Sequence, residues 1–274
     1  MLAELEFPGE DYFRVLARIH EHLKPATYLE IGIDQGLSFE IIRPETLALG
    51  VDPNPRMRKP PTPRQRVFAK TSDEFFEQCD VISELDGKTV DLAFIDGMHH
   101  FEFALRDFIN LERASHPETT VLIHDCLPES EEGAARERTT VLWSGDVWRL
   151  IVLLRRWRPD LEVSVVDWAP TGLGVVRGLD RRSTVLAEHY DEIVEHYLAM
   201  PYGALDDGTM AEQLHQVPGT WDALRAVLPA HPYRSDNVEL LKARRVAHEV
   251  LPAAWRSIEY RVHARRRATG STAA

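Results

Sequence analysis

The chain has 274 residues, enough for one sizeable domain or for one domain with a substantial extension. With 44% hydrophobic and 28% charged residues, it has the composition of a globular protein that folds around a core. The formal net charge of -12 at pH 7 argues against nucleic-acid binding through a broad basic surface. The sequence shows no signal peptide and no apolar run that could span a bilayer, so we expect a cytoplasmic protein with no membrane partner.

The first expected elements are a helix and a buried strand that ends in a glycine turn. Apolar residues recur with helical spacing over residues 11–23, and an apolar run over residues 27–33 predicts the strand. A second helix starts at residues 37–42. Gly32 and Gly36 lie in the turn, where the missing side chains let a ligand approach the backbone. In an open α/β sheet a nucleotide-like ligand binds here, beyond a strand and at a helix N-terminus.

The rest of the chain alternates strands with helices and then changes character. Apolar patterns predict further strands at residues 46–51, 66–70, 90–95, 120–123, 161–168 and 173–176. Helical spacing then recurs at residues 185–198, 221–228 and 237–267. We therefore predict an α/β core over residues 1–180 and a helical extension over residues 181–274, which packs on the core or forms a homo-oligomer interface.

Polar residues follow several of these strands at the same edge of the predicted sheet. Asp52 can accept hydrogen bonds from both ribose hydroxyls of an adenosine cofactor, or it only caps a turn. Ser72 is placed to cap a helix. Asp96 and the pair His124-Asp125 end the next two strands, where titratable groups need partners or a chemical role.

For several residues in this region a purely structural role is the alternative. One of His99 and His100 could simply pack at the following helix, and Asp125 could be a helix cap. For Asp146 we favour the role of a cap on the helix that follows it. Trp143 and Trp148 either line an acceptor pocket or pack in the core.

Several motifs of the chain resemble those of methyltransferases. Residues 30–36 read E-x-G-x-x-x-G, unlike the G-x-G-x-x-G of dinucleotide-binding proteins. This stretch resembles the first motif of class I S-adenosylmethionine (SAM)-dependent methyltransferases. Residues 96–102 and His124-Asp125 resemble the I-D-G-x-H-x-Y/F-E and H-D segments of a bacterial family related to small-molecule O-methyltransferases. With weaker matches at residues 143–148 and 171–176, the resemblance covers about residues 26–178.

The resemblance implies a fold and a set of cofactor-binding residues. It implies a doubly wound, Rossmann-like sheet of seven strands in the order 3-2-1-4-5-7-6, with the last inserted strand antiparallel. It also implies SAM as the cofactor, with the adenine near Ser72 and Asp73. The cofactor-binding residues predicted from the motifs are Glu30, Gly32, Gly36, Asp52, Ser72 and Asp96.

Methyl transfer requires a positioned, unprotonated nucleophile, and two mechanisms would supply one for a hydroxyl group. His99 or His124 could take the proton as a catalytic base. Alternatively, a divalent metal held by Asp96 and Asp125 could bind the hydroxyl and lower its pKa. Because His124 stands where related metal-dependent enzymes have an acid, Mg²⁺ is less expected here than in those relatives.

The sequence therefore predicts methyl transfer from SAM to a hydroxyl of a small molecule, a sugar or a secondary metabolite. One alternative is a nicotinamide-dependent oxidoreductase, in which Asp52 would bind a ribose. The other is a non-catalytic binding protein that kept the fold. The spacing of residues 30–36 argues against the first, and the retained Glu30 and Asp52 argue against the second.

Overall fold

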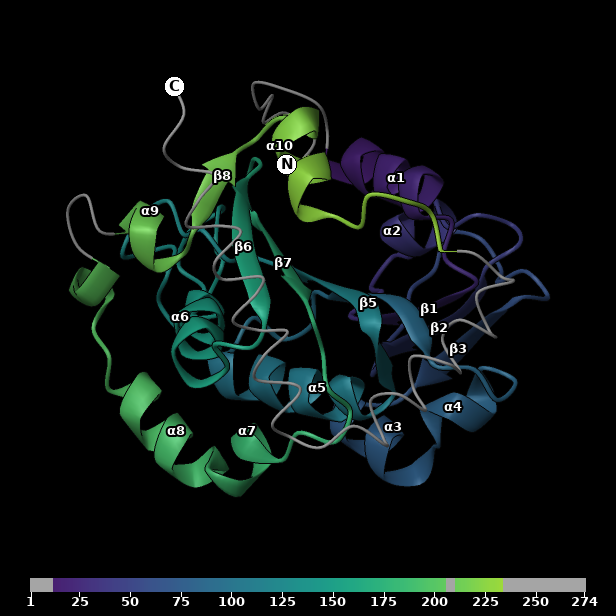
Figure 1. Cartoon of the computed structure of the whole chain (residues 1–274), viewed down its shortest axis with the longest axis horizontal. Helices are drawn as coiled ribbons and strands as arrows, with labels where there is room; N and C mark the ends of the chain where they lie inside the picture. Colours follow the sequence, from purple (N-terminus) through teal and green to yellow (C-terminus); the bar gives the residue numbers. More distant parts are fainter. Residues whose placement is uncertain (1–11, 206–209, 234–274) are drawn as a thin grey trace, which may run out of the picture. The chain divides into compact units, whose positions relative to one another are not determined.

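The computed structural model of the chain describes residues 12–205 and 210–233 (Figure 1). Its contacts divide the chain into a unit of residues 1–233 and a unit of residues 234–274. The helix predicted over residues 237–267 lies outside the described residues. Within the described ranges, no helix combines the length and the apolar character needed to cross a membrane.

A single eight-stranded sheet forms the centre of the first unit, in the order β3-β2-β1-β4-β5-β7-β6-β8 (Figure 1). The predicted order 3-2-1-4-5-7-6 is confirmed, and β7 runs antiparallel to both β5 and β6. The strands are β1 Thr27–Ile31, β2 Leu47–Asp52, β3 Gln65–Ala69, β4 Val90–Ile95, β5 Ser115–His124, β6 Glu162–Asp167, β7 Leu173–Arg177 and β8 Gln216–Pro218. Strand β8, parallel to β6, was not predicted, because its three residues are too few to show a strand pattern.

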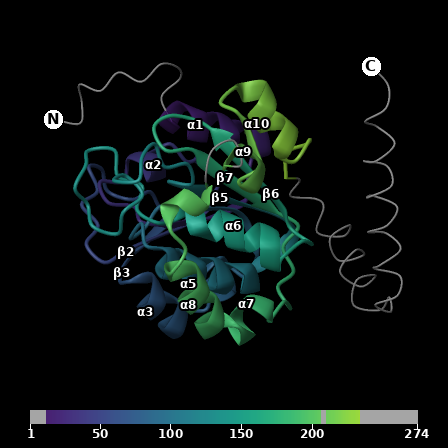
Figure 2. The same ribbon diagram turned by 90° about the vertical axis from the view of Figure 1, so that its left-hand side faces the viewer.

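Helices cover both faces of this sheet (Figures 1 and 2). One face carries α1 Tyr12–Leu23, α2 Leu37–Glu40 and α10 Trp221–Val227. The opposite face carries α3 Ser72–Gln78, α4 Val81–Glu84, α5 Phe101–Arg113, α6 Trp148–Trp157, α7 Val185–Glu188 and α8 Tyr190–Leu198. The short elements η2 Tyr202–Leu205 and α9 Met210–Gln213 precede β8. The sheet is thus buried on both sides, as its nearly continuous apolar strands require.

The described part of the predicted extension is helical where its pattern indicated helices. Helices α7 and α8 fall within residues 185–198, and α10 falls within residues 221–228. The described residues between 181 and 233 belong to the same compact unit as the α/β core. The functional division at residue 180 and the subunit interface stay predictions.

Two predicted helix caps are wrong, and in both cases a different residue has the role. Helix α3 is capped by Thr71, whose hydroxyl accepts the Glu74 amide (3.2 Å) while the Glu74 carboxylate accepts the Thr71 amide (3.0 Å). Ser72 is therefore the first residue inside the helix. At α6 the cap position is Val147, without a side-chain hydrogen bond, so Asp146 does not cap the helix that follows it.

Candidate active site

The two predicted glycines make a tight turn at the carboxyl end of β1. Gly32 has a φ of +91°, and a Cβ atom on it would lie 2.1 Å from the backbone oxygen of Asp96. Gly36 has a φ of +76°, and its Cβ would lie 3.2 Å from the Met57 side chain. Only glycine fits at residue 32, because the loops after β1 and β4 touch there. The turn therefore sits directly against the segment that carries Asp96.

Glu30 is fully buried in β1 and engaged by two hydroxyl groups. Tyr28 donates to one carboxylate oxygen over 2.9 Å, and Ser38 in α2 donates to the other. Burial raises the pKa of Glu30 to about 8, although both hydroxyls act in the opposite direction. Glu30 thus ties β1 to α2 beneath the glycine turn, and direct contact with a cofactor stays a prediction.

Asp52 ends β2 beside the same turn, as expected. Its carboxylate accepts hydrogen bonds from the backbone amides of Asp34 (2.9 Å) and Asn54 (2.7 Å). These bonds are the turn role considered from the sequence, and they also fix the carboxylate next to residues 32–36. An ionised carboxylate can accept about four hydrogen bonds, so further acceptor positions remain for a ribose.

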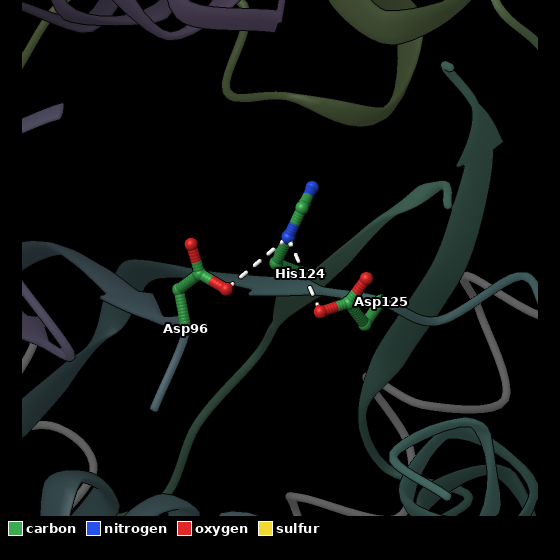
Figure 3. Close-up of side chains that lie close together, drawn as sticks. All are labelled: Asp96, His124 and Asp125. Carbon is green, nitrogen blue, oxygen red and sulfur yellow. Dashed lines mark hydrogen bonds and ion pairs between the residues drawn. The ribbon is translucent and has the colours of Figure 1, made fainter. Parts of the chain in front are cut away.

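Asp96, His124 and Asp125 meet at the carboxyl edge of the sheet, as the motifs predicted (Figure 3). Nδ1 of His124 lies 3.1 Å from Oδ1 of Asp96 and 3.4 Å from Oδ2 of Asp125. One ligand atom from each residue lies within 4.8 Å of the other two, a spacing that suits a metal ion. Asp125 contacts both candidate histidines and does not start a helix, so the suggestion that it is a helix cap is wrong.

His99 joins this cluster from the loop after β4. Its Nδ1 lies 2.6 Å from Oδ2 of Asp125, and its Nε2 lies 3.6 Å from Oδ1 of Asp96. The His99 ring stacks on Trp143, with ring centres 5.1 Å apart and an interplanar angle of 3°. His100, by contrast, packs at the start of α5 and contacts the Arg136 carbonyl (3.0 Å) through Nε2.

Charge compensation dominates the electrostatics of the cluster. Burial lowers the pKa of His124, but the carboxylates of Asp125 and Asp96 outweigh it and raise the pKa well above its usual value. The same balance raises the pKa of His99. Burial opposes ionisation of Asp125, yet the two histidines hold its pKa well below the usual range. The protonated histidines thus supply the positive charge between these carboxylates that a bound divalent cation would otherwise supply.

Two hollows meet at His124. The first is lined by Asp96, Gly97, Met98, His99, Asp107 and Asp125, among others. The second is lined mainly by apolar and aromatic side chains from α1, the β6–β7 loop and the start of β7: Tyr12, Val15, Leu16, Trp168 and Leu173. His124 lines both, and its ring stacks on Tyr12 with centres 4.9 Å apart.

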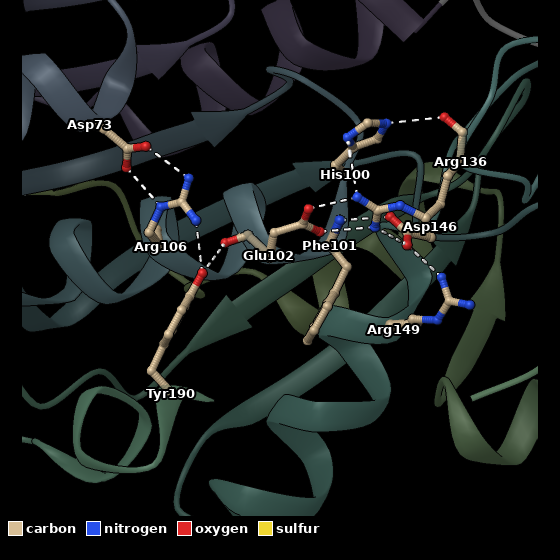
Figure 4. Close-up of polar contacts among 9 residues, drawn as sticks. All are labelled: Asp73, His100, Phe101, Glu102, Arg106, Arg136, Asp146, Arg149 and Tyr190. Atoms are coloured by element: carbon tan, nitrogen blue, oxygen red, sulfur yellow. Dashed lines mark hydrogen bonds and ion pairs between the residues drawn. The ribbon is translucent and has the colours of Figure 1, made fainter. Parts of the chain in front are cut away.

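A buried carboxylate, Asp146, joins the start of α5 to Arg136 and Arg149 (Figure 4). It accepts the Phe101 amide at the start of α5 (2.7 Å) and pairs with Arg136 (2.7 Å) and Arg149 (2.5 Å). The Asp146 amide donates to the His99 carbonyl (3.2 Å). Asp146 therefore caps α5 rather than α6, and it fixes the backbone on both sides of His100.

Sequence reasoning did not identify Asp107, and it left two tryptophans undecided. Asp107 lies on α5 and is 3% exposed. Burial raises its pKa to about 7, against the effect of Ser72. None of the motifs found in the sequence includes Asp107. An acidic residue within a predicted helix is expected to face the solvent, so nothing in the sequence indicates that this one is buried. Trp148 is fully buried in the core, whereas Trp143 contacts His99.

The segment that builds this cluster matches a known domain. Residues 29–126 match the family model of a methyltransferase domain. This segment of the chain is therefore similar to a methyltransferase domain. The match runs from β1 to the residue after Asp125, so it includes both glycines, Asp52 and the cluster at the sheet edge. The matched segment thus contains the candidate site except for most of the second hollow and the loop that carries Trp143.

Solved structures similar to the chain include two O-methyltransferases. One, from Bacillus cereus and in complex with S-adenosylhomocysteine (SAH), is 13% identical with a TM-score of 0.47, covering 65% of this chain and 86% of that one. The other, from Streptomyces achromogenes, acts in tomaymycin synthesis and is in complex with SAM. It is 14% identical with a TM-score of 0.47, covering 65% of this chain and 85% of that one. No curated protein matches the sequence.

Proposed function

We propose that this protein transfers the methyl group of SAM to a hydroxyl of a small molecule, a sugar or a secondary metabolite. The observation that carries the proposal is the cluster of Asp96, His124 and Asp125, which adjoins the glycine turn of a methyltransferase domain. A methyl donor held at the turn would therefore meet an acceptor held at the cluster. The similar O-methyltransferases, solved with SAH and SAM, support the choice of donor.

The donor site is built from the loops that follow β1, β2 and β4. The exposed backbone at Gly32 and Gly36 leaves room for the amino-acid part of SAM, and Asp52 offers acceptor positions to its ribose. SAM supplies an already activated methyl group, so the protein mainly has to position it. Asp96 lies between the turn and His124 and borders both partners of the reaction.

The acceptor site is the second hollow. Its apolar and aromatic lining, from Tyr12 and Leu16 on α1 to Trp168, would exclude water from the body of the acceptor. His124 forms the wall that this hollow shares with the first one. A hydroxyl at the edge of the acceptor would therefore lie against the polar cluster.

In its neutral form, which its raised pKa moves to higher pH than for an ordinary histidine, His124 is better placed than His99 to take the hydroxyl proton. Its Nδ1 faces Asp96 and Asp125, and its other ring nitrogen points away from both carboxylates (Figure 3). The carboxylates would orient the ring and stabilise the imidazolium that forms. Both nitrogens of His99 lie near carboxylates, so His99 stays the second candidate.

The same residues fit a divalent metal. Asp96, Asp125 and His124 would hold it, since their donor atoms already converge and a cation would replace the histidine protons that balance the two carboxylates. Bound there, a metal would orient the acceptor hydroxyl and lower its pKa. The mixed oxygen and nitrogen donors favour a transition metal over Mg²⁺.

The proposal is tested by incubating the protein with SAM labelled in its methyl group and a panel of sugars, phenols and other hydroxyl compounds. We expect label in at least one hydroxyl, loss of transfer in His124→Asn, and normal transfer in His116→Asn, whose histidine lies away from the site. Loss of transfer with chelator and recovery with Mn²⁺ would assign the metal role, whereas unchanged transfer would assign His124 as the base. Transfer to amines alone would contradict the proposal.

A further inference from the structure

His99 and Asp125 both have a left-handed backbone, which is uncommon for residues other than glycine. Their φ angles are +58° and +60°, and the two residues follow the neighbouring strands β4 and β5. Gly145, from the loop between β5 and α6, has a φ of +60°, and a Cβ atom on it would lie 1.9 Å from the His99 carbonyl oxygen. Such backbone conformations persist only where surrounding contacts enforce them, and they gather at functional sites. The contacts of His99 therefore indicate what this residue does.

The loop between β5 and α6 holds His99 at both its ring and its backbone. The Trp143 ring lies parallel to the His99 imidazole, with ring centres 5.1 Å apart and an interplanar angle of 3°. The Asp146 amide donates to the His99 carbonyl over 3.2 Å. Trp143 is itself fixed, because its indole N–H donates to the Ala135 carbonyl over 2.6 Å. The tryptophan thus defines the plane in which the imidazole lies.

In this plane the imidazole meets the Asp125 carboxylate. Nδ1 of His99 lies 2.6 Å from Oδ2 of Asp125, and the same oxygen lies 3.4 Å from Nδ1 of His124. A carboxylate oxygen has two lone pairs, so Oδ2 can face His99 and still face His124 or a cation held beside it. Carboxylates that bind a metal are themselves oriented by neighbouring polar groups. His99 is such a neighbour of Asp125, and Trp143 supports His99 from its other side.

We propose that His99 and Trp143 are positioning residues: Trp143 holds the His99 imidazole, and the imidazole holds the Asp125 carboxylate in the direction of the divalent metal. This inference rests on the proposed function and on its metal-assisted form. Both ring nitrogens of His99 already face carboxylates, at 2.6 Å from Asp125 and 3.6 Å from Asp96. That arrangement favours orientation of a ligand over abstraction of a proton from the acceptor.

The affinity for Mn²⁺, followed by electron paramagnetic resonance, tests this proposal without an acceptor. His99→Asn removes the imidazole and keeps a residue type that tolerates the left-handed backbone. We expect it to weaken Mn²⁺ binding at least about tenfold, the usual effect of losing a residue that orients a metal ligand. Trp143→Leu should weaken binding about threefold or more, while Trp143→Phe, which keeps a flat ring, should stay within about twofold of the wild type.

A double variant separates positioning from a merely structural role. If Trp143 acts through His99, adding Trp143→Leu to His99→Asn should change the Mn²⁺ affinity by less than about twofold. Trp157→Leu is the matched control, because Trp157 at the end of α6 also contacts a histidine ring, that of His189, with centres 5.3 Å apart. This control should bind Mn²⁺ as the wild type does.

Mn²⁺ binding by His99→Asn that equals or exceeds that of the wild type would overturn the inference, as would single effects that add up in the double variant. Absence of Mn²⁺ binding by the wild type would also overturn it, but would leave methyl transfer with His124 as the base. Calorimetry with SAH checks the proposed function separately. All variants should bind SAH as the wild type does, and loss of SAH binding in His99→Asn or Trp143→Leu would overturn the positioning role. Failure of the wild type to bind SAH would overturn the proposed function.

Discussion

Asp146→Ala should destabilise the protein strongly, because it removes the centre of a buried charge network. Asp146 is fully buried and accepts from the Phe101 amide, Arg136 and Arg149. Alanine would leave a helix-terminal N–H and the Arg149 guanidinium, whose side chain is 11% exposed, without this partner. Arg136 would keep its bidentate pair with Glu102 (2.6 and 2.9 Å).

The magnitude follows from these contacts. Removing one partner of a buried ion pair costs about 3–5 kcal/mol, and the retained Glu102 contact places this case near the lower end. With a urea dependence of about 2 kcal/mol per M, the unfolding midpoint should fall by roughly 1.5 M. Asp146→Asn should recover part of this loss, since the amide oxygen can still accept from Phe101.

Urea titration followed by tryptophan fluorescence measures the effect. Asp73→Ala is the control, since its ion pair with Arg106 is partly exposed (46% and 30% of the side chains) and should contribute less than about 1 kcal/mol. If the midpoint of Asp146→Ala fell by no more than that of Asp73→Ala, the account of Asp146 as a buried anchor for residues 99–101 would be refuted.

Three further predictions concern pH, the glycine turn and the metal. Burial lowers the pKa of His116, but Asp91 and Glu118 outweigh it and raise it from 6.5 to about 8. The folded state therefore binds this proton more tightly than the unfolded state. The difference contributes about 2 kcal/mol to the free energy of unfolding below pH 6.5, and this contribution is lost as the pH rises through 8. In urea unfolding measured across this pH range, His116→Asn should show a smaller dependence of stability on pH. Gly32→Ala should abolish SAH binding in calorimetry, since its Cβ would displace the Asp96 backbone; unchanged affinity would contradict the close approach. Mn²⁺ binding, followed by electron paramagnetic resonance, should weaken at least about tenfold in Asp96→Asn, and equal affinity in both proteins would remove Asp96 from the metal site.

The strands and the cluster at the sheet edge could be predicted because each depends on a local signal. Apolar runs mark the buried strands. Because β4 and β5 are parallel neighbours, Asp96 and His124 at their carboxyl ends lie close together independently of the conformation of the loops. The resemblance to methyltransferase motifs then supplied the order that periodicity alone does not give.

What the sequence did not reveal are contacts between distant residues. Asp146 precedes one helix but caps another, 45 positions away in the chain. Asp107 looks like a solvent-facing acid of a helix, yet α5 is covered on that side by α3. At α3 the choice between Thr71 and Ser72 depended on the reach of Glu74 to the Thr71 amide, which only the backbone geometry decides.

The central claim, a SAM site at the glycine turn of the sheet, is tested most directly by titrating the wild-type protein with SAH, SAM and NAD in a calorimeter. We predict micromolar binding of SAH and SAM and no binding of NAD. Binding of NAD without binding of SAH or SAM would contradict the claim and support the nicotinamide-dependent alternative.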